Sequence, residues 1–171
     1  DQRRDRQHQW LKPRLDNRRD ALGLDQVTLI GNSFGGALAL GMMAHHADKV
    51  RSPILMGTPA GEFEQTQGLA DSRSFEPNFD AMRAMMRDFP YDPSIVTDEA
   101  VAARLRVAEI ASGKETIRKL QPGDEQDVKG PRMVKGIPLE QLDAIDVPVL
   151  ILHGREDKMI PLPVAFRMHE H

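Results

Sequence analysis

Apolar residues near the start of the chain follow a strand–helix–strand pattern. Residues 27–30 form an apolar, largely β-branched run that stops at Gly31, and residues 34–46 follow with the small and apolar side chains of a helix packed closely on a sheet. A second apolar run, residues 52–56, ends at Gly57. This order predicts two parallel strands joined by a right-handed crossover, with residues 27–30 as a buried strand.

The pattern between residues 61 and 142 is different, because helical spacing replaces strand-like runs. Proline and glycine separate three segments in which apolar residues recur at helical intervals: 78–89, 97–111 and 113–120. Residues 121–136 are polar and rich in glycine and proline, which predicts a loop. We therefore expect residues 61–142 to form a helical lid. Its Phe and Met side chains either face an apolar substrate pocket or make the lid's own core.

The apolar pattern of a sheet returns near the end of the chain, at residues 147–153. We therefore expect an α/β protein with a mostly parallel sheet, in which residues 21–60 and 143–171 form the core and the lid is inserted between them. Residues 1–20 differ from both parts, since arginine and aspartate alternate there with few apolar residues. They predict a poorly packed polar arm that becomes helical near residues 17–22, and a solvated charged surface explains it better than a binding site.

A Gly-x-Ser-x-Gly sequence, Gly31 to Gly35, joins the first predicted strand to the following helix. In this setting the pattern is the nucleophile elbow of α/β-hydrolases, a turn so tight that the serine backbone is strained and its hydroxyl is exposed. Larger residues two positions before or after Ser33 are expected to collide, which explains both glycines. The Phe34 amide, at the helix N-terminus, is placed to donate to an oxyanion.

A candidate for the catalytic acid lies in the loop that follows the strand at residues 147–153. Asp157 stands in this polar loop, C-terminal to the serine, which fits the chain order Ser…Asp…His of these hydrolases. Its carboxylate would hold a histidine in the correct tautomer and stabilise the imidazolium. Glu156, next to it, is a competing candidate on the residues alone.

Three motifs stand out in combination: Gly-Asn-Ser-Phe-Gly-Gly at 31–36, Leu-Met-Gly at 55–57 and His-Gly-Arg-Glu-Asp-Lys-Met-Ile-Pro at 153–161. Together they resemble the meta-cleavage product hydrolases, which are α/β-hydrolases of bacterial aromatic degradation. The resemblance runs from about residue 22 to residue 169 and includes the lid. It implies hydrolysis of a carbon–carbon bond in a 2-hydroxy-6-oxo-dienoate, which gives a hydroxydienoate and a carboxylic acid.

The resemblance also implies roles for single residues. By it, Ser33 is the nucleophile, Asp157 is the triad acid, and the Phe34 amide is half of the oxyanion hole. Asn32 is a polar neighbour of the site. Arg104 ends a lid segment similar to the family's stretch with an arginine that binds the dienoate carboxylate. On the residues alone, Arg104 is a solvated helix arginine.

The chain departs from the family's pattern at both ends. The family's catalytic histidine follows a further helix and a final strand, whereas the residues after Asp157 here predict one helix. We therefore expect that neither His169 nor His171 is the catalytic histidine. The N-terminal strands and the His-Gly loop that supplies the second oxyanion amide are not visible before Ser33. The pattern predicts a fragment of a longer hydrolase that is nearly inactive by itself.

Composition narrows the function further. Apolar residues make up 40% and charged residues 29% of the chain, with a formal net charge of -3, a balance that predicts no nucleic-acid or membrane surface. The absence of cysteine excludes disulfides, thiolate metal sites and a cysteine nucleophile. A serine hydrolase needs no metal or organic cofactor. We expect a cytoplasmic enzyme with a small-molecule substrate, and a homo-oligomer is compatible with the full-length enzyme.

Two other functions fit the same residues. An ordinary carboxylesterase would use the same triad on esters and would not need a carboxylate clamp at Arg104. A non-catalytic ligand-binding domain of the same fold, or an incomplete and inactive product, would lack the downstream histidine. Dehalogenase and epoxide hydrolase chemistry is disfavoured, because those relatives have aspartate at the position of Ser33.

Overall fold

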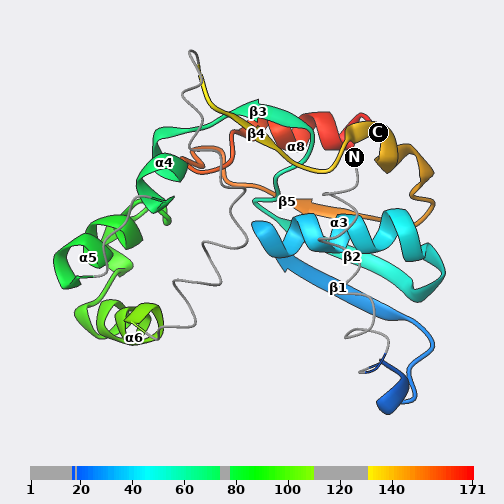
Figure 1. Cartoon of the computed structure of the whole chain (residues 1–171), viewed down its shortest axis with the longest axis horizontal. Helices are drawn as coiled ribbons and strands as arrows, with labels where there is room; N and C mark the ends of the chain where they lie inside the picture. The colour runs from blue at the N-terminus through cyan, green and yellow to red at the C-terminus, as the bar shows by residue number, and fades with distance from the viewer. Residues whose placement is uncertain (1–16, 18, 74–77, 110–130) are drawn as a thin grey trace. The chain divides into compact units, whose positions relative to one another are not determined.

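The computed structural model describes residues 17, 19–73, 78–109 and 131–171 (Figure 1). The polar arm expected at residues 1–20 falls mostly outside these ranges, although residues 17 and 19–21 are helical. The helix expected at residues 113–120 and most of the loop expected at residues 121–136 also lie outside the described residues.

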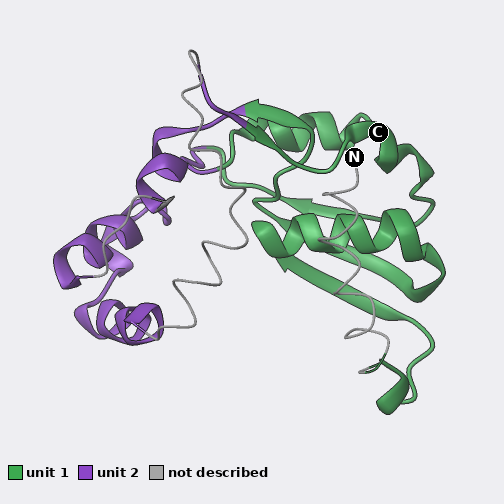
Figure 2. Ribbon diagram, viewed as in Figure 1, with its two compact units in different colours: residues 1–63, 134–155, 160–171 green, residues 64–133, 156–159 purple. Residues whose placement is uncertain are grey.

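The chain forms two compact units (Figure 2). Unit 1 consists of residues 1–63, 134–155 and 160–171, and unit 2 consists of residues 64–133 and 156–159. Unit 1 contains the parallel sheet, and unit 2 contains the helices of the block expected to be a lid. The short segment 156–159, which follows the last strand, is therefore grouped with the helices rather than with the sheet.

The sheet of unit 1 has three strands in the order β1-β2-β5, and both neighbouring pairs are parallel. The strands are β1 (Val27–Asn32), β2 (Val50–Met56) and β5 (Leu150–Leu152). Asn32 is opposite Met56, and Met56 is opposite Leu152, so the three strands end at one edge. The predicted parallel arrangement is confirmed. The last strand is shorter than the predicted 147–153, because only residues 150–152 pair with β2.

Helix α3 (Phe34–His46) connects β1 to β2 through a short 3-10 helix, η1 (Ala47–Lys49), and packs on both strands. Its buried residues include Leu40 and Met43, which meet a sheet core that contains the buried Val50 and Leu55. The small residues of α3 permit a close approach, since a Cβ built on Gly36 would overlap the buried side chain of Thr58. The helix predicted at residues 34–46 is confirmed.

One side of the sheet is exposed, which corrects the expectation that β1 is a buried strand. Successive side chains of a strand point to opposite faces, and the exposed Thr28, Ile30 and Asn32 alternate with more buried positions. Ile30 is 68% exposed, and Leu150 and Leu152 are about half exposed. Within the described ranges no element covers these side chains, so an apolar run in the sequence does not amount to burial on both faces.

Two short strands, β3 (Glu62–Glu64) and β4 (Met133–Lys135), form a separate two-stranded sheet. The prediction of a loop at residues 121–136 is therefore wrong at β4, and the block expected to be purely helical also contains strands. Pairing with a distant segment stabilises β4. Next to it, the Gly136 N–H donates to the Gly61 carbonyl and the Gly61 N–H donates to the Ile137 carbonyl, both at 2.7 Å. Unit 1 also contains the 3-10 helix η3 (Leu139–Ala144) and α8 (Leu162–His169).

Unit 2 contains α4 (Gln67–Arg73), α5 (Phe79–Arg87), the 3-10 helix η2 (Pro93–Ile95) and α6 (Asp98–Glu109). Side-chain caps start two of these helices: Asn78 Oδ1 accepts from the Ala81 N–H at 2.9 Å, and Thr97 Oγ1 accepts from the Ala100 N–H at 3.2 Å. The helices predicted at residues 78–89 and 97–111 are confirmed at Phe79–Arg87 and Asp98–Glu109, and residues 110–111 lie outside the described residues. Helix α5 packs against α6, and the fully buried Met82 belongs to the core of this unit.

Substitution of two neighbouring glycines tests the close approach of α3 to the sheet. We expect Gly36→Ala to destabilise the protein by about 1–3 kcal/mol, because the new methyl group would overlap Thr58 in a packed interior. Gly35→Ala should be neutral or stabilising by up to about 1 kcal/mol, because the added Cβ meets no atom of another element within 4 Å and alanine favours the helix. Urea denaturation of both variants measures the difference, and equal destabilisation would contradict this packing.

Candidate functional site

Ser33 occupies the single residue between the last residue of β1 and the first residue of α3. Its backbone has φ 51 and ψ -119, and it is the sole residue other than glycine with positive φ among the described residues. A side chain in this region of φ/ψ space is strained and persists where the surrounding structure enforces it. Ser33 is also exposed. The predicted tight turn with a strained serine between strand and helix is confirmed.

Hydrogen bonds hold this turn on both sides. The Ser33 N–H donates to the Met56 carbonyl at the end of β2 at 2.8 Å, and the Asn32 side-chain amide donates to the same carbonyl at 3.3 Å. The Ser33 carbonyl accepts from the N–H groups of Gly36 and Ala37 at 2.9 and 3.2 Å, which starts the helix. Asn32 thus helps to fix the turn to the neighbouring strand.

Gly31 and Gly35, two positions before and after Ser33, differ in how strictly the turn requires a glycine. A Cβ on Gly31 would lie 2.5 Å from the Gly35 carbonyl oxygen and 2.6 Å from the Gly36 Cα, and these are backbone atoms that cannot move aside. By contrast, a Cβ built on Gly35 has no atom within 4 Å other than those of its chain neighbours and of its own helix backbone. The steric reason expected for Gly35 is therefore not found for a side chain as small as a methyl group. Gly35 instead supplies the backbone that Gly31 approaches.

Phe34 is the first residue of α3, so its N–H has no acceptor within the helix. Such an N–H can stabilise negative charge that develops next to the serine. The Ser33 hydroxyl forms no hydrogen bond with any residue in the described ranges. The elbow therefore places an exposed serine hydroxyl beside the first N–H of α3, and within the described ranges no base forms a hydrogen bond with that hydroxyl.

Asp157 lies in the loop between β5 and α8. Residues 156–159 of this loop belong to unit 2. Asp157 Oδ1 accepts from the Met159 N–H at 2.8 Å, a local turn that orients the carboxylate. Asp157 is half-buried, whereas the competing Glu156 is exposed. The sequence analysis assigned no role to His153. Its Nε2 lies 2.8 Å from the Ile160 carbonyl oxygen, and this contact joins the two ends of the loop, both of which belong to unit 1.

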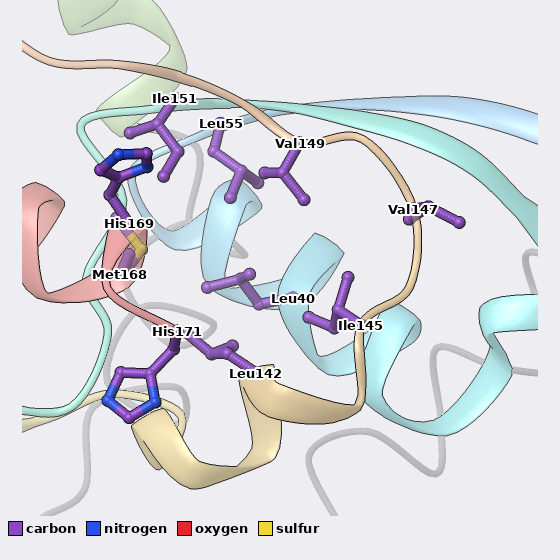
Figure 3. A pocket seen from close by; sticks show the side chains of 10 residues that line it. All are labelled: Leu40, Leu55, Leu142, Ile145, Val147, Val149, Ile151, Met168, His169 and His171. Atoms are coloured by element: carbon purple, nitrogen blue, oxygen red, sulfur yellow. The ribbon is translucent and has the colours of Figure 1, made fainter.

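Two histidines near the end of the chain line a cavity of about 210 Å³ in unit 1 (Figure 3). They are His169 at the end of α8 and His171 just beyond it, where Nδ1 lies 2.7 Å from an oxygen of Asp143. The rest of the lining is mostly aliphatic and includes Leu40 of α3. Ser33 does not line this cavity, so the cavity does not mark the site of serine chemistry.

Arg104 is an exposed residue of α6 in unit 2. Its guanidinium carbon lies 5.1 Å from the centre of the Phe89 ring, a cation–π distance. It forms no ion pair with a residue that the structure describes, in contrast to Arg83, which lies 2.6 Å from an oxygen of Asp98. An arginine ordered by an aromatic ring keeps its hydrogen-bond donors available for an anion.

Two features are absent from the described parts of the chain. These parts hold no group of three or more His, Asp or Glu residues placed to bind a metal ion. None of their helices is both long enough and apolar enough to cross a membrane. Of the predicted site residues, the structure therefore brings Asn32, Ser33 and Phe34 together at the elbow of unit 1 and places Arg104 and Asp157 in unit 2.

Replacing Ser33 tests the strain at the elbow. We expect Ser33→Gly to be more stable than Ser33→Ala by about 1–2 kcal/mol, because glycine adopts positive φ without the strain that any Cβ causes. Both variants lack the hydroxyl, so the comparison isolates the backbone. The free energy of unfolding from urea denaturation measures it, and equal stability of the two variants would show that the turn is unstrained.

Comparison with known proteins agrees with this geometry. A sequence model described as alpha/beta hydrolase fold matches residues 5–91. A 2-hydroxy-6-oxo-2,4-heptadienoate hydrolase from Pseudomonas putida is 37% identical over 153 residues, which are 88% of this chain and 54% of that protein. A 2-hydroxymuconate semialdehyde hydrolase from Pseudomonas sp. strain CF600 is 32% identical over 87% of this chain and 52% of its own length.

A solved structure is also similar to this one. The meta-cleavage product hydrolase from Pseudomonas fluorescens IP01 superposes with a TM-score of 0.77 at 29% identity, over 89% of this chain and 55% of that chain. The chain spans about half the length of the relatives that it matches. The strained serine elbow at the edge of a parallel sheet and these matches lead to one conclusion: the chain belongs to the alpha/beta hydrolase fold family.

Proposed function

We propose that this protein is a serine hydrolase that cleaves a carbon–carbon bond in 2-hydroxy-6-oxo-dienoates, the ring-cleavage products of aromatic degradation. The observation that carries the proposal is the elbow, in which Ser33 has φ 51 between β1 and α3 and is exposed. The names of the similar hydrolases support the substrate class. A cytoplasmic enzyme with a small-molecule substrate follows from the same proposal.

The proposed reaction starts with attack of Ser33 Oγ on the 6-oxo carbonyl carbon. The Phe34 N–H stabilises the resulting oxyanion. The carbon–carbon bond then breaks, its electron pair passes to the dienoate fragment, and a proton is delivered there. Water hydrolyses the acyl-serine and releases the carboxylic acid. Asp157 orients the histidine that moves the protons, and neither His169 nor His171 takes this role in the proposal.

The helices of unit 2 serve as the lid in this proposal. Their core contains Met82 and Val101, both fully buried, while Phe89 is 47% exposed. A unit with its own small core and an exposed aromatic ring can cover an apolar substrate without losing its fold. The guanidinium of Arg104 lies over the ring of Phe89. We propose that this guanidinium binds the substrate carboxylate.

A turnover assay tests the proposed activity and whether this chain supplies a base for Ser33. We expect the chain to hydrolyse a coloured 2-hydroxy-6-oxo-dienoate slowly, because no described base contacts the Ser33 hydroxyl. Ser33→Ala should remove this turnover. A p-nitrophenyl ester is the comparison substrate. Faster Ser33-dependent turnover of the ester than of the dienoate would favour a carboxylesterase, and rapid turnover of the dienoate would mean that a histidine of this chain completes the site.

Ligand binding tests Arg104 separately from turnover. We expect Arg104→Gln to weaken binding of a 2-hydroxydienoate by about ten-fold, because a charge-assisted hydrogen bond to the carboxylate is lost. Binding of the methyl ester of the same compound should change by less than about two-fold. Calorimetry measures both dissociation constants.

The matched control is Arg106→Gln, since Arg106 is also an exposed arginine of α6. It should leave both dissociation constants unchanged. An equal effect of Arg104→Gln on the acid and the ester, or an equal effect of the two substitutions on the acid, would contradict the carboxylate clamp at Arg104.

A further inference from the structure

The loop that carries Asp157 is attached to the first helix of unit 2. Residues 156–159 are coloured with that unit in Figure 2, although β5 and α8 on either side belong to unit 1. A contact that explains this grouping is the hydrogen bond from Thr66 Oγ1 to the Met159 carbonyl oxygen, 2.9 Å long and partly buried. It joins residues 93 positions apart in the chain.

Thr66 also begins helix α4. Its Oγ1 accepts from the Leu69 N–H at 3.2 Å, which is an N-terminal cap. A threonine hydroxyl has one proton to donate and lone pairs to accept, so the same oxygen serves the helix and the loop. The start of α4 and the position of the Met159 carbonyl are therefore set together.

Gly68 allows the loop to lie directly on α4. A Cβ on Gly68 would lie 2.8 Å from the Lys158 carbonyl oxygen and 3.0 Å from the Met159 sulfur. The backbone of the loop thus occupies the space that any side chain at this position would need. The start of α4 therefore contacts two successive carbonyls of the loop: Gly68 packs on that of Lys158, and Thr66 donates to that of Met159.

Met159 links this attachment to the Asp157 carboxylate. The Met159 carbonyl accepts from Thr66, and the Met159 N–H donates to Asp157 Oδ1 at 2.8 Å. A displacement of the carbonyl turns the same residue and weakens the bond that orients the carboxylate. The ion pair between Lys158 and Asp88, 2.8 Å long, contributes little because both side chains are well exposed.

We propose that Thr66 is a positioning residue for Asp157, acting through Met159. The role of Asp157 as the acid rests on the proposed function above, whereas its attachment to α4 through Thr66 does not. The consequence is that the orientation of the acid depends on the first helix of unit 2 as well as on the strand that precedes the loop.

Three substitutions of Thr66 separate the donor from the cap. Thr66→Ser keeps both hydrogen bonds, Thr66→Val loses both, and Thr66→Asp keeps an acceptor for the Leu69 N–H but has no proton to donate to Met159. Hydrogen exchange of the Met159 amide, followed by NMR, reports the bond to Asp157. We expect exchange to be about five-fold faster in the Val and Asp variants, and unchanged in the Ser variant.

Two control substitutions accompany them. Ser72→Ala removes a hydroxyl hydrogen bond of 2.9 Å within α4 that does not reach the loop, and Asp88→Asn removes the exposed ion pair. Neither should change the exchange of Met159. If Thr66→Asp behaves like the unchanged protein, or if Ser72→Ala accelerates exchange as much as Thr66→Val, the loop responds to helix stability alone and the proposal is wrong.

Activity measurements keep this proposal distinct from the proposed function. Asp157→Asn tests the acid, because its loss should lower any Ser33-dependent turnover. Should Asp157→Asn leave turnover unchanged, the assignment of the acid fails while the exchange data still decide whether Thr66 orients the Asp157 side chain. Exchange that is unaffected in Thr66→Val would overturn the positioning role even if Asp157→Asn lowers turnover.

Discussion

The close approach of Gly31 to the backbone of residues 35 and 36 is the constraint on which the sheet unit depends. It lets the chain pass from β1 into α3 through one residue, and that residue, Ser33, takes the positive φ. The Met56 carbonyl holds the turn to the neighbouring strand. The exposed hydroxyl, the helix N–H at Phe34 and the packing of α3 on the sheet therefore have a common cause.

Two charged groups of the candidate site have a neutral partner in the structure. The Asp157 carboxylate accepts from a backbone N–H, and the Arg104 guanidinium lies over the ring of Phe89. A neutral partner orients a charge without cancelling it. An arginine held in this way keeps its hydrogen-bond donors for a substrate carboxylate, as the proposed function requires.

Local signals in the sequence were sufficient for most elements and for the strained turn at Ser33. The strand–helix–strand unit, the caps at Asn78 and Thr97 and the turn at Ser33 all follow from residues within a few positions of one another. Where the prediction was wrong, the presence or absence of a partner far away in the chain decided the outcome. Strand β4 exists because it pairs with β3, and Ile30 is exposed because no described element covers it.

The sequence by itself determined that a serine stands in a strained turn between a strand and a helix, because spacing and backbone sterics act over a few residues. Only the tertiary structure showed that Gly35 has open space, that Gly36 meets Thr58, and that Thr66 reaches the Met159 carbonyl. Such contacts join residues far apart in the chain. Their distances depend on how whole elements pack, which no local pattern of residues encodes.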